Sequence, residues 1–249
     1  GVYCEGGSTK LDTCTLKNNT ASIEGGAIYC WHSNDTEVVD CMISDNAAER
    51  GAGIRCYESS PLISASTIAQ NIASDDGGGI YLNDSSDAMI LNCTISGNTS
   101  INDGAGIATI HSDPHISDCI IENNNIIGTA ENAWGGGVYC YYSNPTIIRC
   151  EIKNNSSVVI GGGLRSDNSM PSLTDTGVCG NTPDQIYGSW TNNGGNQIAE
   201  ICPPDCNENG VYDNEDIANG FSLDCNTNGV PDECDIADGT SSDCNVNSI

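Results

Sequence analysis

Oxygen-bearing side chains stand at alternate positions of two short segments in the C-terminal part of the chain. Each segment begins Asp-Cys-Asn, continues with Asn-Gly and ends with two further aspartates, and the second begins 19 residues after the first. Calcium takes six to eight oxygen ligands on a flexible twelve-residue loop, from positions 1, 3, 5, 7, 9 and 12, with glycine at position 6. Both segments match that spacing, which therefore predicts two calcium sites.

The two sites draw their ligands from matching positions of the two segments. The first predicted set consists of Asp205, Asn207, Asn209, the Val211 carbonyl, Asp213 and Asp216. The second consists of Asp224, Asn226, Asn228, the Val230 carbonyl, Asp232 and Asp235. A third copy supplies only Asp243, Asn245 and Asn247, and we expect a partner or further sequence to complete this partial site. Mg²⁺ fits less well, because it keeps more water and takes fewer protein ligands.

The loops differ from a full EF-hand, because position 12 is Asp rather than a bidentate Glu and no long flanking helices are predicted. They resemble the calcium repeats of dockerins and of thrombospondin type 3 segments. The resemblance implies that Ca²⁺ is the bound ion, and the dockerin likeness implies attachment to a scaffold. The helical stretches after the loops are expected to be short, around Ile217-Ala218 and Ile236-Ala237.

Upstream of these loops, a Gly-Gly-x-aliphatic phrase recurs at a nearly constant interval and defines the repeating elements. Two copies have Ala at the second position. Its copies begin at Gly25, Gly51, Gly77, Gly104, Gly135 and Gly161. The steps between them are 26, 26, 27, 31 and 26 residues, and Gly1 fits one step earlier. A fixed period of this length marks a repeat architecture.

A second phrase keeps the same period. A small residue, often Cys, is followed by x-aliphatic-x-x-Asn about ten residues after each glycine phrase. Its asparagines are Asn19, Asn46, Asn71, Asn98, Asn124, Asn155 and Asn181. The units are rich in Thr, Ile, Val, Ser and Gly and lack a sustained helical pattern, which indicates short strands between turns. Each unit therefore predicts one coil of a parallel β-solenoid, whose strands pair with their copies about 4.8 Å away.

We expect about seven such coils over residues 1–202 and a separate calcium-binding segment over residues 203–249, which begins at Pro203-Pro204. The asparagines should stack as a ladder at one corner, where αL geometry is tolerated, and the glycines should allow another corner to turn tightly. This all-β pattern resembles right-handed parallel β-helix proteins with repeats like those of polymorphic outer-membrane proteins. The resemblance implies the fold but no single function, because this scaffold carries lyases, hydrolases, adhesins and passive surface proteins.

Composition limits the partners. The formal net charge is −27, with only seven Lys plus Arg, which argues against nucleic acid and anionic membrane surfaces and favours cations. No apolar run is long enough to predict a membrane span. The chain opens in mid-unit at Gly1, which we interpret as a processed or trimmed N-terminus.

The fifteen cysteines fall into two populations. Nine stand in the two repeat phrases and are predicted to be small buried hydrophobes, because their occurrence shows no pairing within coils. The others stand in turn-rich sequence, where disulfides are expected, and they imply an oxidising, extracellular compartment. These disulfide candidates are Cys179, Cys202, Cys206, Cys225, Cys234 and Cys244.

No acid–base constellation of a polysaccharide lyase or hydrolase is evident, so we expect no catalytic residues and a non-enzymatic protein. The best catalytic column precedes the second phrase, and its Asp118 and Arg149 should form a surface ion pair. That column holds Thr13, Asp40, Ala65, Asn92, Asp118, Arg149 and Asp175. Another column, expected to stack on an exposed sheet, holds Tyr3, Tyr29, Arg55, Tyr81, Ala108, Tyr139 and Arg165.

Two further features lie outside the repeat phrases. Residues 126–132 carry an insertion of four and are expected to form a protruding loop beside Trp134. His111 and His115 could hold a metal, but Pro114 forbids a regular helix there, so both are expected to be ordinary loop residues.

We therefore expect an extracellular structural protein whose rods associate head-to-tail into a calcium-stabilised filament or surface layer. The open edges of a solenoid favour this, as do the half-formed first coil and the half-formed last calcium loop. The alternative is a secreted protein that binds or degrades a polysaccharide, as a lyase or glycoside hydrolase, and is anchored by a dockerin-like tail. The expected partners are a second copy of the chain, a polysaccharide, or a cell-surface scaffold.

Overall fold

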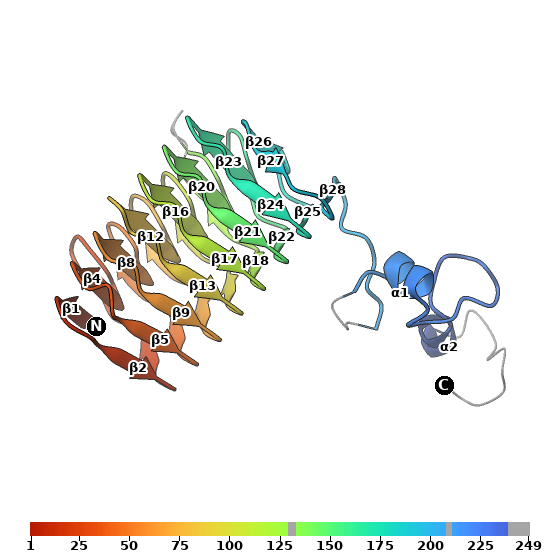
Figure 1. Ribbon diagram of the computed structural model, residues 1–249, viewed down its shortest axis with the longest axis horizontal. Coiled ribbons are helices and arrows are strands. Elements are labelled where there is room, and N and C mark those ends of the chain that lie inside the picture. Colours follow the sequence, from red (N-terminus) through yellow and green to blue (C-terminus); the bar gives the residue numbers. More distant parts are fainter. Residues whose placement is uncertain (129–132, 208–210, 239–249) are drawn as a thin grey trace. The chain divides into compact units, whose positions relative to one another are not determined.

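The computed structural model describes residues 1–128, 133–207 and 211–238 (Figure 1). Contacts divide the chain into two compact units, Gly1–Glu200 and Ile201–Ile249. The first is a stack of short strands, and the second contains two short helices. Within the described part of the chain, no helix has both the length and the apolar character needed to cross a membrane.

Four parallel sheets, named A to D, form the first unit. Sheet A contains β1 (Val2–Glu5), β4 (Ile28–Trp31), β8 (Ile54–Tyr57), β12 (Ile80–Asn83), β16 (Ile107–Ile110), β20 (Val138–Tyr141), β23 (Leu164–Asp167) and β26 (Ile186–Tyr187). Sheet B contains β2 (Lys10–Asp12), β5 (Glu37–Val39), β9 (Leu62–Ser64), β13 (Met89–Leu91), β17 (His115–Ser117), β21 (Thr146–Ile148), β24 (Ser172–Thr174) and β27 (Thr191–Asn192). Sheet C contains β3 (Thr15–Lys17), β6 (Met42–Ser44), β10 (Thr67–Ala69), β14 (Thr94–Ser96), β18 (Ile120–Glu122), β22 (Glu151–Lys153), β25 (Gly177–Cys179) and β28 (Gln197–Ala199). Sheet D contains β7 (Ala47–Ala48), β11 (Ile72–Ala73), β15 (Thr99–Ser100) and β19 (Asn125–Ile126).

Every strand pairs with its copy one coil away, so the chain winds as a right-handed solenoid (Figure 1). The register follows the repeat: Ile28 of β4 lies opposite Ile54 of β8, and Ile80 of β12 lies opposite Ile107 of β16. The prediction of a parallel β-solenoid of about seven coils is confirmed. Strands β26 to β28 add a short last set that lacks the glycine phrase.

The core is a narrow column of aliphatic side chains. Strands of sheets B and C alternate buried and exposed positions, and their central residues, such as Ile63, Ile90 and Ile95, are fully buried. Because successive side chains of a strand point to opposite faces, one aliphatic residue per short strand is enough to fill the interior. A core of this kind needs few aromatic residues.

The Asn ladder lies at the corner after sheet C. The Asn98 side chain donates to Asn124 Oδ1 (3.0 Å) and to the Ile68 carbonyl (2.9 Å), and the backbone N–H of Asn98 donates to the same Oδ1 (3.0 Å). The pattern repeats from Asn19 to Asn181 and ends on the side chain of Gln185. The residue in the αL conformation is the one before each ladder Asn, and not the ladder Asn itself, which the sequence had suggested; Gly97, with φ +62°, is one example. A side-chain oxygen thereby satisfies the backbone that the turn leaves unpaired.

Two other corners use the same device. After sheet A, a buried serine follows each αL residue, and the N–H of Ser86 donates to Ser112 Oγ (3.0 Å). The remaining serines of this ladder are Ser33, Ser59, Ser143 and Ser169. After sheet B, the Cys column does this work: Cys41 N–H donates to Ser66 Oγ (3.0 Å), and Cys41 Sγ donates to the Val39 carbonyl (3.2 Å). Cys, Ser and Thr can each occupy this column, because each has a short side chain that both donates and accepts a hydrogen bond.

The glycine phrase turns the fourth corner. Its first residue is αL, as at Gly77 with φ +64°, where a side chain would be strained. Its third residue serves close packing instead, since a Cβ on Gly53 would collide with the Gly79 carbonyl and lie 3.1 Å from the Asn71 amide. The phrase therefore combines a tight turn with the close approach that the Asn ladder requires.

Candidate functional site

The two calcium-type loops of the second unit lead into matching helices. Helix α1 (Asp213–Asn219) begins at position 9 of the first loop, and α2 (Asp232–Asp238) begins at position 9 of the second. Positions 9 and 12 are three residues apart on a helix, so their aspartates lie on one face. The expectation of short helices after the loops agrees with these seven-residue elements.

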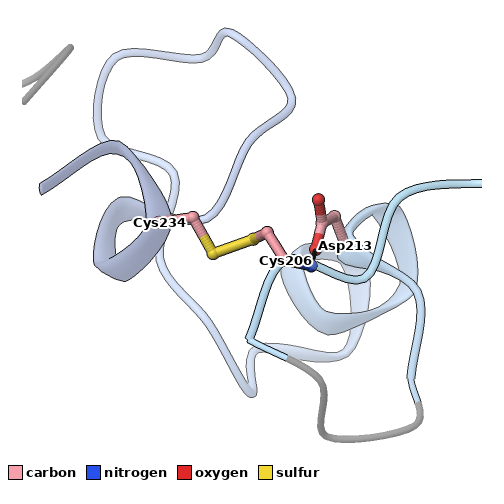
Figure 2. A group of neighbouring side chains, drawn as sticks. All are labelled: Cys206, Asp213 and Cys234. Carbon is pink, nitrogen blue, oxygen red and sulfur yellow. Dashed lines mark hydrogen bonds between the residues drawn. A yellow bond between two sulfur atoms is a disulfide. The ribbon is translucent and has the colours of Figure 1, made fainter. Parts of the chain in front are cut away.

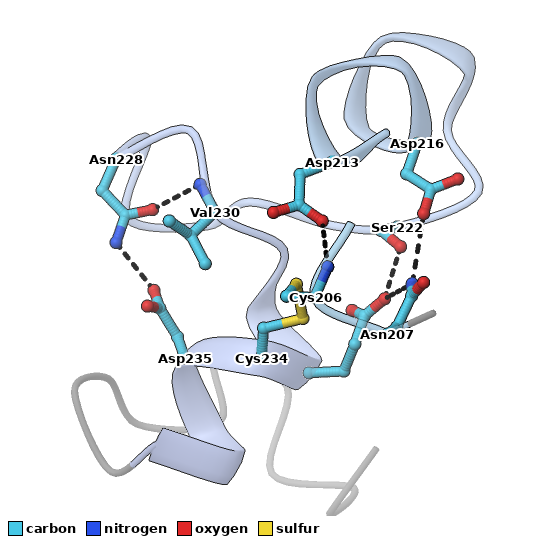
Figure 3. Close-up of a disulfide and its surroundings, with 10 residues drawn as sticks. Cys206, Asn207, Asp213, Asp216, Ser222, Asn228, Val230, Cys234 and Asp235 are labelled. Carbon is cyan, nitrogen blue, oxygen red and sulfur yellow. Dashed lines mark hydrogen bonds between the residues drawn. A yellow bond between two sulfur atoms is a disulfide. The ribbon is translucent and has the colours of Figure 1, made fainter. Parts of the chain in front are cut away.

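Each of these aspartates turns back to the start of its own loop. Asp213 Oδ1 accepts from the N–H of Cys206 (2.8 Å), and Asp232 Oδ1 accepts from the N–H of Cys225 (2.9 Å). At position 12, Asp216 Oδ2 accepts from the amide of Asn207 (3.1 Å) in the same way (Figure 3). In these contacts, made by described residues, the two loops correspond as they do in sequence.

The second loop is described throughout. Asp235 Oδ2 accepts from the side-chain amide of Asn228 (2.9 Å; Figure 3) and from that of Asn226 (2.6 Å). Asp224 accepts from the backbone N–H groups of Asn228 and Gly229. Rotating either amide by 180° exchanges its Nδ2 for Oδ1. Hydrogen bonds therefore link residues at the predicted ligand positions 1, 3, 5 and 12 of this loop.

Four carboxylates of the second unit are almost completely buried. The exposed fractions of Asp213, Asp216, Asp232 and Asp235 are 1%, 0%, 6% and 3%. The sequence after Glu200 contains no Lys, Arg or His. Buried carboxylates need a compensating positive charge, because hydrogen bonds alone do not offset the cost of removing them from water. The donor set, all oxygen and strongly anionic, fits a hard divalent cation such as Ca²⁺.

Other predicted ligands are less fully placed. Asp205 is half-buried, and Val211 lies two residues before α1, next to its N-cap Tyr212. Asn209 of the first loop lies outside the described residues, as does the predicted partial site of Asp243, Asn245 and Asn247. In the described residues, hydrogen bonds join Asn226 and Asn228 to Asp235 in the second loop, and Asn207 to Asp216 in the first.

A disulfide joins the two loops. Cys206 of the first loop is bonded to Cys234 of α2, with 6.0 Å between their Cα atoms (Figure 2). Cys206, Asp213 and Cys234 lie close enough to suggest a metal cluster. Both sulfurs are consumed by the disulfide, however, so neither is available as a thiolate ligand.

The remaining cysteines separate as the sequence suggested. Cys179, Cys202 and Cys225 are also disulfide-bonded, and Cys244 lies outside the described residues. The nine cysteines of the repeat phrases are free, and all except Cys14 are buried.

Glu233 of α2 adds a polar link between the loops. Its Oε1 accepts from the amide of Asn207 (3.1 Å) and from the hydroxyl of Ser222 (Figure 3). Burial opposes ionisation of Glu233, but hydrogen bonds from Ser222, its own backbone N–H and Asn207 together hold the pKa of this carboxyl below its usual value. The disulfide and this carboxylate hold the two loops as one module.

A second polar cluster lies on the solenoid, in the column directly before the glycine phrase. That column holds Glu24, Arg50, Asp76, Asp103, Trp134 and Ile160. Asp76 Oδ1 accepts from the N–H of Asp103, and Asp103 Oδ1 accepts from the N–H of Trp134, each at 3.1 Å. The two carboxylates therefore come from adjacent coils, about 4.8 Å apart along the stack.

Both carboxyl groups resist ionisation. Burial, together with the charge of Asp75, raises the pKa of Asp76 to about 6, although the Asp103 N–H and the arginines partly oppose this. Burial and the charge of Asp76 raise the pKa of Asp103 to about 8. Near neutral pH, a protonated Asp103 thus stands beside a largely ionised Asp76, which is the arrangement of a general acid and its partner carboxylate.

The outward column of sheet A packs beside these acids and corrects an expectation. It was predicted to stack on an exposed sheet, yet Arg55, Tyr81 and Tyr139 are only 2%, 4% and 3% exposed. Arg55 forms an ion pair with Glu24 and lies 4.3 Å above the Tyr81 ring. Arg165 lies 5.4 Å from the Trp134 ring. The side chains of the column directly before the glycine phrase cover this face of sheet A. The period-two alternation of a strand alone does not predict that cover.

The column predicted as the best catalytic candidate is different. Its residues are the αL residues of the corner before sheet C, so they project outward. Asp118 and Arg149 form the expected surface ion pair, with Nε–Oδ1 and Nη2–Oδ2 distances of 2.7 and 2.8 Å. Asp76 and Asp103 lie in another register, one residue before each glycine phrase, and there the repeat places the two aspartates on adjacent coils.

Comparison with known proteins identifies the fold and little else. The family model described as the right handed beta helix region matches residues 1–173 of the chain. No curated protein and no solved structure matches the chain.

Proposed function

Since the chain belongs to the right-handed β-helix family, in which the scaffold does not define the activity, we propose a function from the second unit: the protein is a calcium-binding extracellular structural protein. One observation carries the proposal. Two equivalent loops bury four carboxylates in a segment without a basic residue. Two Ca²⁺ ions, one per loop, would compensate these charges and complete the coordination with loop carbonyls.

The extracellular location is part of this proposal. Disulfides form and persist in oxidising compartments, and the second unit contains Cys206–Cys234 as well as bonded Cys202 and Cys225. Extracellular calcium is abundant enough to occupy sites of even modest affinity.

Isothermal titration with Ca²⁺ tests the binding. We expect two ions per chain, and one fewer in each of Asp216→Asn and Asp235→Asn, because each variant removes the position-12 carboxylate of one loop. Asp40→Asn, an exposed corner residue of the solenoid, is the matched control and should keep both ions. Equal stoichiometry in all four proteins, or no heat in the parent chain, would contradict the proposal.

We extend the proposal to assembly: the rods associate head-to-tail, and Ca²⁺ stabilises the joint. Support comes from apolar side chains of the calcium unit, because Ile201, Phe221 and Leu223 are 83%, 75% and 56% exposed. Large exposed apolar side chains close together mark interaction sites in soluble proteins. Electron micrographs in calcium and in EDTA test this, and monodisperse particles in both would refute it.

A second candidate function is favoured by the acid pair. Asp76 and Asp103, flanked by Tyr81 and Tyr139, would bind or cleave a polysaccharide, with Asp103 as general acid. Glycan arrays and assays for new reducing ends or unsaturated uronates test it. Loss of the signal in Asp103→Asn but not in Asp118→Asn would support this role, and the absence of any signal in the parent chain would exclude it.

A further inference from the structure

Glu233 of helix α2 is a point at which the two calcium-type loops differ. It stands at position 10 of the second loop, between the predicted ligands Asp232 and Asp235. The matching residue of the first loop, 19 positions earlier, is Asn214. Glu233 is half-buried, whereas Asn214 is exposed. The second loop thus carries a partly buried carboxylate where the first carries an amide open to solvent.

The side chain of Glu233 reaches the other loop. Its Oε1 accepts from Nδ2 of Asn207 (3.1 Å), the predicted ligand at position 3 of the first loop. The same oxygen accepts from the hydroxyl of the buried Ser222, whose backbone N–H donates to the Asp216 carbonyl (3.2 Å). Glu233 therefore contacts one predicted ligand residue of the first loop directly and a second one through Ser222.

This contact orients the amide of Asn207. A side-chain amide offers nitrogen as a donor and oxygen as an acceptor, and Ca²⁺ takes only the oxygen. Nδ2 of Asn207 also donates to Asp216 Oδ2 (3.1 Å), but Asp216 is itself a predicted ligand. Glu233 is thus the acceptor for this amide that an ion in the first loop would not claim. Because Glu233 holds Nδ2, Oδ1 is the atom of Asn207 that can serve as a ligand.

The second loop has no such partner among the described residues. Its position-3 amide, Asn226, donates to Asp235 Oδ2 (2.6 Å) of its own loop. No residue of α1 in the described structure accepts from Asn226, and Asn214 points to solvent rather than to the other loop. The support that Glu233 gives therefore runs in one direction, from the helix of the second loop to the ligands of the first.

We propose that Glu233 is a positioning residue of the first calcium site and that it makes this site the tighter of the two. The inference rests on the proposed calcium binding. A partner that orients a metal ligand typically contributes about 10–100-fold to metal affinity. The disulfide between Cys206 and Cys234, the residue after Glu233, keeps α2 beside the first loop, so the orienting carboxylate is in place before an ion binds.

Calcium titration of single-site variants tests this role. Asp235→Asn leaves the first loop as the intact site, and Asp216→Asn leaves the second. Adding Glu233→Ala to Asp235→Asn should weaken calcium binding by about 10–100-fold. Adding it to Asp216→Asn should leave the affinity of the second loop unchanged. Asn214→Ala, at the matching exposed position of α1, is the control and should bind like its background in both cases.

Two further substitutions separate orientation from packing. Glu233→Gln keeps an oxygen acceptor and should recover most of the affinity that Glu233→Ala loses, whereas Glu233→Met has a similar size without an acceptor and should bind like Glu233→Ala. Circular dichroism checks that each variant is folded. The proposal is overturned if Glu233→Ala binds as tightly as Asn214→Ala in the first-loop background, or if both backgrounds lose affinity alike. Those results leave the proposed function standing, whereas a parent chain that binds no calcium overturns both.

Discussion

At the scale of single residues, the chain uses short polar side chains to complete its backbone hydrogen bonds. The side chains of Asn98, Ser86 and Cys41 differ in chemistry, yet each forms a hydrogen bond with a backbone group at an αL turn: Asn98 Oδ1 and Ser86 Oγ accept from the N–H groups of Asn71 and Ser59, and Cys41 Sγ donates to the Val39 carbonyl. Cys41 thus contributes to the turn as Ser and Asn do at the other corners. Burial raises the pKa of Cys140 to about 12, which keeps this thiol neutral and unreactive.

Thiol labelling should show this protection. In the native protein we expect rapid alkylation of Cys14 alone among the nine free cysteines, because it is the only one that is not buried in the described structure. Denaturation without reductant should expose all nine, as counted by mass spectrometry. Rapid native labelling of Cys119 or Cys150 would contradict a closed core.

The acid pair predicts a pH-dependent stability. Raised carboxyl pKa values mean that the native state holds protons which the unfolded chain has released, so stability falls as pH rises from about 4 through the folded pKa values of about 6 and about 8. Asp103→Asn keeps the acceptor for the Trp134 N–H but removes the charge. Its solenoid should be more stable than the parent at pH 9 by roughly 1–3 kcal/mol and equal at pH 4. Denaturant melts at both pH values measure this, and a loss of stability at pH 9 would disprove it.

At the scale of elements, the ladders fix the register of the coils. Each ladder side chain bonds to the next coil, so a strand shifted by one residue would break bonds at every corner. Asn98→Ala removes the oxygen that accepts from the backbone N–H and side-chain amide of Asn71, and the amide that donates to the Ile68 carbonyl, and should cost about 2–4 kcal/mol. Ser96→Ala on the half-exposed face of β14 is the control, with an expected change within about 0.5 kcal/mol. Comparable losses of stability in the two variants would mean that the Asn ladder stabilises the fold no more than a partly exposed strand residue does.

The elements also show what the sequence could predict. A period of about 26 residues, with an Asn at the position of Asn98 in each coil, determines the coil, because each coil repeats the same local solution. The two loops and the short helices after them were predictable for the same reason, since their turn and helix signals are local. Burial of Tyr81 and Arg55 was not, because the residues that cover them come from a turn column whose direction depends on the αL corner. The αL residue was assigned one position too late, since Asn is compatible with both roles.

At the scale of the whole molecule, two units with different sources of stability share one chain. The solenoid is held by aliphatic burial and ladders, whereas the second unit buries few apolar side chains and relies on disulfides such as Cys206–Cys234 and, in our proposal, on Ca²⁺. Calorimetry should therefore show separate transitions. Calcium at about 100 times its dissociation constant adds about 2.7 kcal/mol per site to the second unit and nothing to the solenoid. EDTA should lower only the calcium-sensitive transition, and Asp216→Asn with Asp235→Asn should remove the difference between the two conditions. If both transitions moved together with calcium, the ion would have to link the units, and head-to-tail joints would then require contacts from the solenoid as well as from the loops.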